Sequence, residues 1–339
     1  MIVSSARLFV FLVLTFGLSA AASAKVARAP VLDLPLRCTV GVDCFVQHFM
    51  DVRPGQQAAD NQCGSLTYNG HKGTDIRIRN LAQMDKGVPV LAAEDGTVTN
   101  LRRGVNDQYY SDYSKKKKKE IYNIGLGNVV ILNHGGKWTT FYAHLKKGSI
   151  QVVKGQRVSK GEILGYVGMS GLTEFPHLHF ELRHKNKRID PFTGLEKDAT
   201  CGKFEKNYWS AKTSAKLPYV PTFFVNSGFS ETRPEGRKDL ESGRKKQDEF
   251  RTGARHLFFW NYYIGSRKGD KVSLKLMDPD GKVLTKHTTK PMGKHQISRT
   301  LFIGVKRPSS GWKQGIYRGE IAILRDGKKI RESATIVFR

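Results

Sequence analysis

A chain of 339 residues is long enough for two domains or for one large one. It carries 57 lysines and arginines against 30 aspartates and glutamates, a formal net charge of +27. Such a charge favours polyanions or anionic surfaces, with nucleic acid and an anionic cell envelope as two examples, although it also serves solubility alone. The sequence has no nucleic-acid recognition motif, so we expect no specific nucleic-acid binding and keep anionic envelope polymers as candidate partners.

Residues 1–24 have the pattern of a secretory signal peptide. Arg7 supplies the positive charge, LFVFLVLTFGL the apolar core, and Ala22, Ser23 and Ala24 the small residues of a cleavage site. The apolar stretch is short for a membrane span, and a retained anchor is the alternative. No second stretch approaches spanning length. We therefore expect an exported protein, periplasmic or extracellular, with no membrane span after signal removal.

Export affects how the cysteines are interpreted, because thiols outside the cytoplasm tend to pair. Cys38, Cys44, Cys63 and Cys201 allow three connectivities, among which the sequence alone does not choose. Cys38 and Cys44 are close enough for a local loop, and a Cys63–Cys201 bridge would then tie together the two ends of one domain. Since no C-x-x-C pair is present, we do not expect a cysteine zinc site.

Residues 25–64 have little periodic pattern and are expected to be irregular. From residue 65 to residue 213 the chain consists of short β segments separated by glycine turns. One example is VPVLAAEDGTVTNL, with a turn at Asp95-Gly96, and NVVILNHGGKWTTFYAHL repeats the scheme. No long stretch has a 3.6-residue apolar repeat, so we predict a mainly antiparallel β domain. The lysine run SKKKKKE, residues 114–120, is expected to be a solvated loop tip.

The segment SAKLPYVP, residues 214–221, resembles a linker and contains two prolines. Residues 222–339 contain further β segments with Asp-Gly turns. This pattern suits a β-sandwich-like domain of roughly seven strands. The aromatic residues of HLFFWNYY alternate too poorly to form a binding stripe, so we expect them to pack in a core.

Five residues with metal-binding or catalytic side chains lie in the first β region. His177 and His179 are two residues apart in the β-like run FPHLHF, so they share one face of a strand. GHKGTD supplies His71 and Asp75, and TFYAHL supplies His144. An H-x-H pair alone is weak evidence for a metal site. The other histidines and the aspartate in the same region strengthen that evidence. We expect no role for the remaining histidines: His48, His134, His184, His256, His287 and His295.

A catalytic zinc site typically has three protein ligands and one open position. His71, Asp75 and one histidine of the pair would supply that set, and the other histidines would line the open side. Zinc makes water acidic enough to serve as a nucleophile near neutral pH, and a free imidazole can accept the proton. The sequence has no H-E-x-x-H motif, which excludes a thermolysin-like arrangement.

The stretch from about residue 65 to residue 193 resembles the lysostaphin-type, or LytM-like, zinc endopeptidases of bacterial cell walls. The matching pieces are GHKGTDIRI, GVPVLAAEDGTV, GNVVILNHGGKWTTFYAHL, VKGQRVSKGEILGYVGMSG and PHLHFELR, in the order of the family. The resemblance implies a small antiparallel β fold with a groove across the sheet. It also implies that His71, Asp75 and His179 bind one zinc ion per chain, while His144 and His177 act on the substrate.

Two departures from this family are present. The segment from Arg102 to Ile124 is longer than usual and is expected to border the groove. The C-terminal region lies outside the resemblance, and it either binds envelope polymers or packs on the catalytic groove.

The resemblance implies an exported zinc metalloendopeptidase that hydrolyses peptide bonds in peptidoglycan, in cross-links or stem peptides. A catalytically silent regulator of other wall hydrolases and a zinc peptidase of protein substrates are the alternatives. The intact set of ligands and partner histidines argues against the silent regulator.

Overall fold

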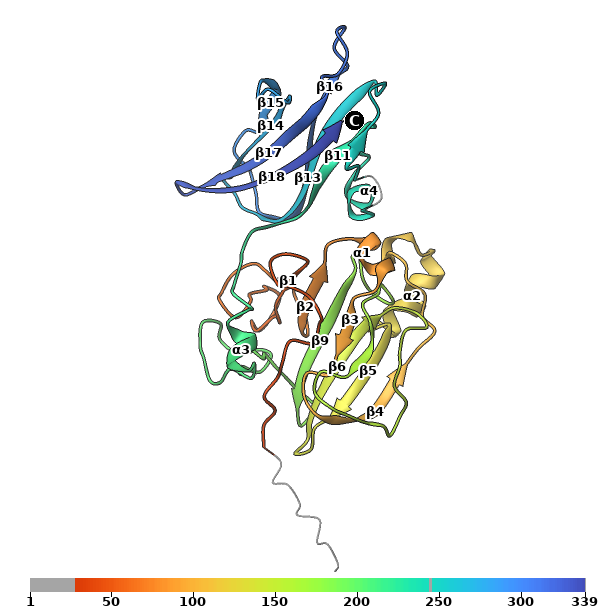
Figure 1. The fold of residues 1–339 in the computed structure, drawn as a ribbon. Coiled ribbons are helices and arrows are strands. Elements are labelled where there is room, and N and C mark those ends of the chain that lie inside the picture. The colour runs from red at the N-terminus through yellow and green to blue at the C-terminus, as the bar shows by residue number, and fades with distance from the viewer. Residues whose placement is uncertain (1–27, 244–245, 339) are drawn as a thin grey trace, which may run out of the picture.

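The computed structural model describes residues 28–243 and 246–338, which form two lobes joined by an extended segment (Figure 1). The signal peptide expected at residues 1–24 lies outside the described residues. Both lobes consist mainly of antiparallel strands, which confirms the predicted fold class. Within the described ranges, no helix has the length and apolar character needed to cross a membrane.

An eight-stranded sheet in the order β1-β2-β9-β6-β5-β4-β7, with β10 paired to β9, forms the N-terminal lobe. A two-stranded sheet of β3 and β8 lies beside it. The bounds are β1 Cys44–His48, β2 Thr74–Ile78, β3 Pro89–Leu91, β4 Gly96–Arg102, β5 Asn128–Asn133, β6 Trp138–Leu145, β7 Arg157–Val158, β8 Ile163–Tyr166, β9 His177–His184 and β10 Lys187–Ile189. Residues 25–64, expected to be irregular, thus include the strand β1.

Strand β9 shows why the core and the site lie on opposite faces of this sheet. Leu178, Phe180 and Leu182 are buried in the main hydrophobic core of the lobe. Because side chains alternate along a strand, His177 and His179 point to the other face. The apolar residues of β9 therefore anchor the strand in the core, and its two histidines face the site.

Five short helical segments complete the described chain: α1 Leu81–Lys86, the 3-10 helix η1 Tyr110–Asp112, α2 Lys115–Asn123, α3 Ala211–Ser214 and α4 Arg237–Glu241. The expectation of a loop at the lysine run is wrong, because residues 115–123 form α2. Ser114 caps this helix by accepting a hydrogen bond from the Lys117 amide, and Ile121 is buried. Lysine also has a good intrinsic helix propensity. The one buried side chain, Ile121, is then enough to hold this short helix against the domain.

Both disulfides join the cysteines in the expected pairs. Cys38 is bonded to Cys44, six residues away, and Cys63 is bonded to Cys201, 138 residues away. The short bridge closes a local loop before β1, and the long bridge ties the start of the sheet region to the segment that follows β10.

Removal of the long bridge is expected to destabilise the protein more than removal of the short one. In the loop-entropy model, the paired substitutions Cys63→Ser and Cys201→Ser cost roughly 4 to 5 kcal/mol, because a long loop becomes unrestricted in the unfolded chain. The matched pair Cys38→Ser and Cys44→Ser costs about 2 kcal/mol in the same model. Urea unfolding followed by circular dichroism measures both values. An equal or larger loss on removal of the short bridge would contradict this ranking.

The C-terminal lobe is a sandwich of a three-stranded sheet, β11-β13-β16, and a five-stranded sheet, β12-β18-β17-β14-β15. The bounds are β11 Phe223–Ser230, β12 Glu249–Phe250, β13 His256–Ser266, β14 Lys271–Met277, β15 Val283–Thr288, β16 Gln296–Lys306, β17 Gly315–Arg325 and β18 Lys328–Phe338. Side chains of both sheets share one core, including Phe259 of β13 and Ile321 of β17. The aromatic run in β13 is buried as expected, with Trp260, Tyr262 and Tyr263 almost fully covered.

The two lobes are joined by an apolar contact and a buried ion pair. The ring of Phe45 in β1 stacks on that of Phe223 in β11, with centroids 4.7 Å apart. Arg77 of β2 and Glu241 of α4 form an ion pair at 2.7 Å, with both side chains 0% exposed. Arg77 also donates to Tyr262 of β13. The C-terminal lobe thus packs on the N-terminal lobe, and both expectations for its role, binding of envelope polymers and packing on the groove itself, stay predictions.

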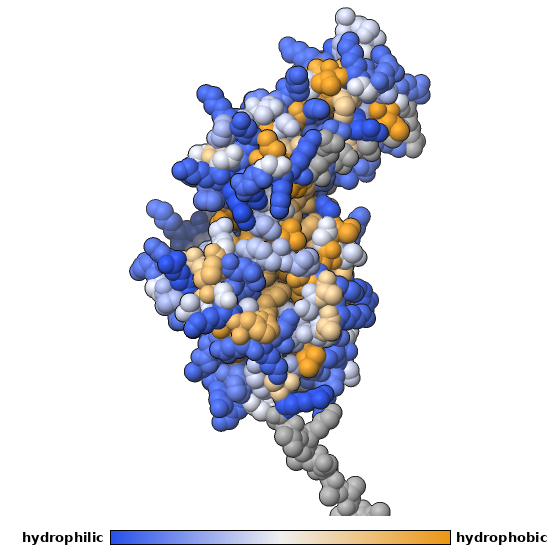
Figure 2. All heavy atoms as spheres, turned by 90° about the vertical axis from the view of Figure 1, so that its left-hand side faces the viewer, coloured by the Kyte–Doolittle hydropathy of each residue, from blue (hydrophilic) through white to orange (hydrophobic). Residues whose placement is uncertain are grey.

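The outer surface reflects the composition. Figure 2 shows mostly hydrophilic side chains on the face it presents, with apolar side chains scattered among them over both lobes and at the waist between them.

Candidate functional site

Strand pairing brings the residues predicted for the site together from three parts of the sequence. β2 pairs with β9 so that Asp75 lies opposite His179. β6 pairs with the other edge of β9, and His144 lies near the end of β6, next to the residue opposite His179. His71 precedes β2 by three residues. Because β2, β9 and β6 are neighbours, all five predicted residues gather on one side of the sheet.

His71, Asp75 and His179 offer donor atoms that lie within 4.8 Å of one another. The Nε2 atom of His71 is 3.0 Å from Oδ1 of Asp75, and Nδ1 of His179 is 2.8 Å from the same oxygen. All three side chains are buried. Two imidazole nitrogens and one carboxylate oxygen match the donor types that bind transition metals in proteins, so the residues present fit a metal ion.

Hydrogen bonds indicate which ring nitrogen of His71 and of His179 faces Asp75. His71 donates from Nδ1 to the carbonyl oxygen of Phe49 at 2.6 Å, which leaves the lone pair on Nε2. His179 donates from Nε2 to Oε1 of Glu181 at 3.2 Å, so Nδ1 is the nitrogen that faces Asp75. Such outer partners commonly orient metal-binding histidines. Glu181 was not predicted as a residue of the site. Its place two residues after His179, on the same strand face, is the sequence signal that points to it.

His144 and His177 lie beside the ligand cluster, with ring centroids 4.7 Å apart. His144 donates from Nδ1 to the carbonyl oxygen of Ser170 at 2.7 Å, and His177 donates from Nδ1 to that of Phe175 at 2.9 Å. In both rings Nε2 is therefore the nitrogen left for chemistry. His144 has a φ of 60°, in the left-handed region that non-glycine residues rarely adopt outside constrained sites.

His48 also belongs to this site, and the expectation that it has no role conflicts with its position. It is 5% exposed, and its Nδ1 donates to Oδ2 of Asp75 at 3.1 Å. The contact arises because β1 pairs with β2 in a register that sets His48 opposite Asp75. No local pattern around residue 48 signals this pairing. Asp75 thus has Oδ1 toward His71 and His179 and Oδ2 held by His48.

Burial and charge act together on the titration of the cluster. Burial alone would raise the pKa of Asp75, but the adjacent His71 and His177 imidazoles hold it well below its usual range. Burial likewise opposes protonation of His179, yet its bonds to Asp75 and Glu181 raise the pKa to about 9. Burial, then the charges of His177 and His179, hold the pKa of His144 well below its usual range. Asp75 and Glu181 therefore favour the protonated form of His179, whereas His144 stays neutral.

A cavity of about 190 Å³ opens beside these groups, and we call it the catalytic cavity. Asp75, His144 and His177 line it, together with Tyr68 and with Tyr110 of η1. Because Tyr110 lies between Arg102 and Ile124, the expectation that this long connection borders the groove is confirmed.

The other two histidines of the N-terminal lobe have structural partners away from the cluster. His134 bonds to the Asp95 carbonyl and to Thr140, and the His184 ring stacks on Trp138 at 4.2 Å.

Residues 69–191 match the family described as Peptidase family M23. A protein of Haemophilus influenzae named "Uncharacterized metalloprotease" is 32% identical over 124 residues, which is 36% of this chain and 20% of that protein. "Peptidoglycan DD-endopeptidase ShyA" of Vibrio cholerae is 37% identical over 120 residues, 35% of this chain and 22% of that protein. The catalytic domain of the antimicrobial peptidase lysostaphin from Staphylococcus simulans aligns with 25% identity and a TM-score of 0.26, covering 36% of this chain and 78% of that one.

The chain thus spans about a fifth of the length of these two curated relatives. The residues that match the family model, 69–191, include the H-x-x-x-D and H-x-H segments that converge in the structure. Residues 69–191 are thus the part of the chain that is similar to Peptidase family M23.

Proposed function

We propose that the chain is an exported zinc metalloendopeptidase that hydrolyses peptide bonds in peptidoglycan, in cross-links or in stem peptides. The convergence of His71, Asp75 and His179 beside two further imidazoles carries this proposal. Relatives named as metalloprotease and peptidoglycan DD-endopeptidase support the reaction and the substrate. The two disulfides suit an oxidising compartment and so support export.

The ligand set would hold zinc through Nε2 of His71, Oδ1 of Asp75 and Nδ1 of His179, and three protein ligands leave an open side. When bound, zinc supplies a Lewis acid that polarises a carbonyl and makes water a nucleophile near neutral pH. The bonds from His71 to Phe49, from His48 to Asp75 and from His179 to Glu181 keep each ligand in place before the ion arrives.

His144 and His177 would move protons and stabilise charge on the reacting peptide. Each ring is fixed through Nδ1, so its Nε2 faces the catalytic cavity. A neutral imidazole can accept a proton at Nε2 from the attacking water and return it to the leaving amine. A protonated one can donate a hydrogen bond to the oxygen on which negative charge develops. The lowered pKa of His144 suits it to the accepting role.

Digestion of purified peptidoglycan with and without a chelator tests the proposal. We expect soluble muropeptides from the untreated full-length protein, none after chelation, and recovery of activity when zinc is returned. The masses of the released fragments identify the bond that is cleaved. Cleavage of casein without release of muropeptides would instead support a peptidase of protein substrates. Inactivity on both substrates, together with stimulation of another wall hydrolase, would support a silent regulator.

A further inference from the structure

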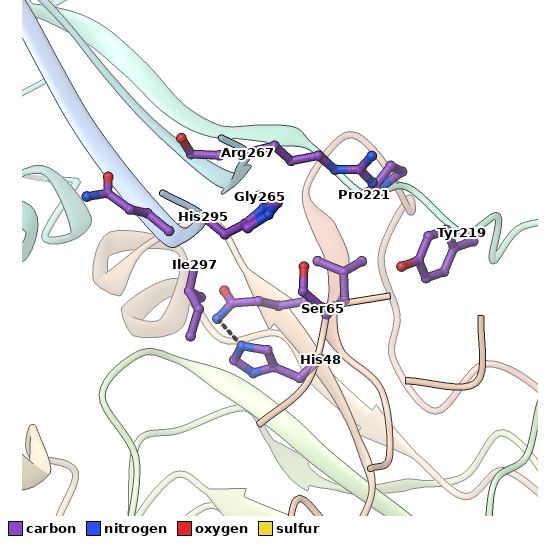
Figure 3. Close-up of a pocket in the computed structure, with 12 residues that line it drawn as sticks. His48, Ser65, Tyr219, Pro221, Gly265, Arg267, His295 and Ile297 are labelled. Carbon is purple, nitrogen blue, oxygen red and sulfur yellow. Dashed lines mark hydrogen bonds between the residues drawn. The ribbon is translucent and has the colours of Figure 1, made fainter. Parts of the chain in front are cut away.

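A second cavity, of about 80 Å³, lies where the two lobes meet, and we call it the inter-domain cavity. Figure 3 shows His48 and Ser65 of the N-terminal lobe below it and Arg267 and His295 of the C-terminal lobe above. The C-terminal lobe lies outside the M23 match, so this cavity is a feature of the two-lobed chain rather than of residues 69–191 alone.

One hydrogen bond connects the inter-domain cavity to the catalytic centre. His48 lines the inter-domain cavity, and its Nδ1 donates to Asp75, which lines the catalytic cavity. The other ring nitrogen of His48 accepts from Gln47 at 3.4 Å, the contact drawn as a dashed line in Figure 3. The His48–Asp75 contact therefore separates the inter-domain cavity from the catalytic cavity, and the two lie on either side of it.

The inter-domain cavity is electropositive. Arg267 and His295 line it, and none of its described lining residues carries a carboxylate. The structure shows no hydrogen bond or ion pair of the Arg267 guanidinium with another described residue. Two acids lie nearby: Asp60 accepts from the Tyr219 hydroxyl at 2.9 Å, and Asp270 is paired with Arg325 at 2.6 Å and also accepts from the Arg267 amide. The positive charge of the cavity is thus available to an anionic group.

The backbone that carries Arg267 is held rigidly. The Arg267 amide donates to Asp270 at 2.8 Å, and the carbonyl of Gly265 accepts from Arg325 at 2.8 Å. Gly265 has a φ of +79°, and a Cβ there would lie 1.9 Å from the carbonyl oxygen of Pro221. The chain therefore needs glycine at this position to pass so close to the linker. Such support places the start of the Arg267 side chain before a ligand arrives.

We propose that the inter-domain cavity is a substrate subsite that binds a carboxylate of the peptide near the scissile bond, with Arg267 as its main contact. The proposal rests on the function proposed above. A guanidinium presents its N–H groups in a planar fork that matches the two oxygens of a carboxylate. A volume of about 80 Å³ suits a single carboxylate-bearing group rather than a longer stretch of peptide. The C-terminal lobe would thereby select substrates in which such a group lies close to the bond.

Binding of purified muropeptides, with carboxylates free or converted to carboxamides, tests the subsite. Titration calorimetry on the full chain carrying His177→Ala measures affinity with little hydrolysis. We expect Arg267→Gln to weaken binding of the free acids about tenfold or more, as for loss of a charge-assisted bond, and to leave binding of the carboxamides unchanged. Lys268→Gln removes the same charge from the next residue, which does not line the cavity, and should have a much smaller effect.

Equal losses of affinity in Arg267→Gln and Lys268→Gln would show that the effect comes from the overall positive charge of the protein, and this result would overturn the subsite. Equal affinity of the unsubstituted Arg267 protein for acids and carboxamides would also overturn it, and that comparison needs no change at Arg267. Failure of the proposed function gives a different result. Muropeptides would then bind with a carboxylate preference but would not be cleaved by the wild-type protein. Cleavage without any carboxylate preference would reject only the subsite.

Discussion

Replacement of Glu241 with alanine is expected to lower the free energy of unfolding by about 3 to 5 kcal/mol. Glu241 and Arg77 are both 0% exposed, so the variant would leave a guanidinium buried without its carboxylate. Glu241 also accepts from Arg237 at 2.8 Å, and this second bond would be lost as well. The junction between the lobes would therefore lose its main polar contact.

The same substitution is expected to reduce turnover. The Arg77 guanidinium lies 5.0 Å from the Phe175 ring centroid, and that ring stacks on His177 at 4.4 Å. Displacement of Arg77 would therefore disturb a side chain in contact with His177, to which we assign proton transfer.

Asp112→Ala is the matched control, because it also removes a carboxylate that pairs across the lobes, with Lys238. That pair is half exposed, so its loss should cost no more than about 1 kcal/mol. A second comparison replaces both buried partners with apolar residues, as Arg77→Met with Glu241→Leu, and should recover much of the lost stability. Urea unfolding monitored by circular dichroism measures all three variants. Equal stability of the Glu241 and Asp112 variants would show that the buried pair does not secure the junction.

His177→Ala is expected to retain its zinc and to lose about 10² to 10⁴ in turnover, the usual effect of losing a proton-transfer group. Its Nε2 lies 3.4 Å from Oδ1 of Asp75, and we assign it to proton transfer rather than to the ligand set. His71, Asp75 and His179 already suffice for an open site. His144→Ala should behave in the same way, since its ring is held by a backbone carbonyl beside the cluster.

Zinc content and peptidoglycan hydrolysis should be measured on the same preparations of both variants. His184→Ala is the control, because His184 lies on the same strand but stacks on Trp138 away from the cluster. It should keep both zinc and activity. Loss of zinc from His177→Ala, or full activity without that imidazole, would contradict the separate roles assigned to the two histidines of the H-x-H pair.

Local sequence patterns predicted which side chains gather in this cluster, because two of them lie two residues apart on one strand. The two-residue period of β9 places His177 and His179 on one face and Phe180 in the core, and this can be read directly from the letters. The family resemblance then selected His179 rather than His177 as the ligand. Asp75 and His144 follow from motifs near the ends of other strands.

Contacts between distant segments account for what the sequence did not reveal. His48 reaches Asp75 only because β1 pairs with β2 in one register, and no periodicity encodes that pairing. Arg77 and Glu241 are 164 residues apart, and each resembles an ordinary surface charge until the lobes pack. The helix at residues 115–123 was missed for the opposite reason: β segments on both sides suggested a loop, whereas capping by Ser114 and burial of Ile121 decide the local structure.

The metal content of purified full-length protein, compared between the wild type and His179→Ala, tests the ligand set most directly. His179 contributes Nδ1 at 2.8 Å from the shared Asp75 oxygen, and loss of that nitrogen leaves only two ligands. We predict one zinc ion per wild-type chain and almost none in the variant, with hydrolysis lost alongside the metal. A His179→Ala protein that is fully occupied by zinc would contradict the metal site described here.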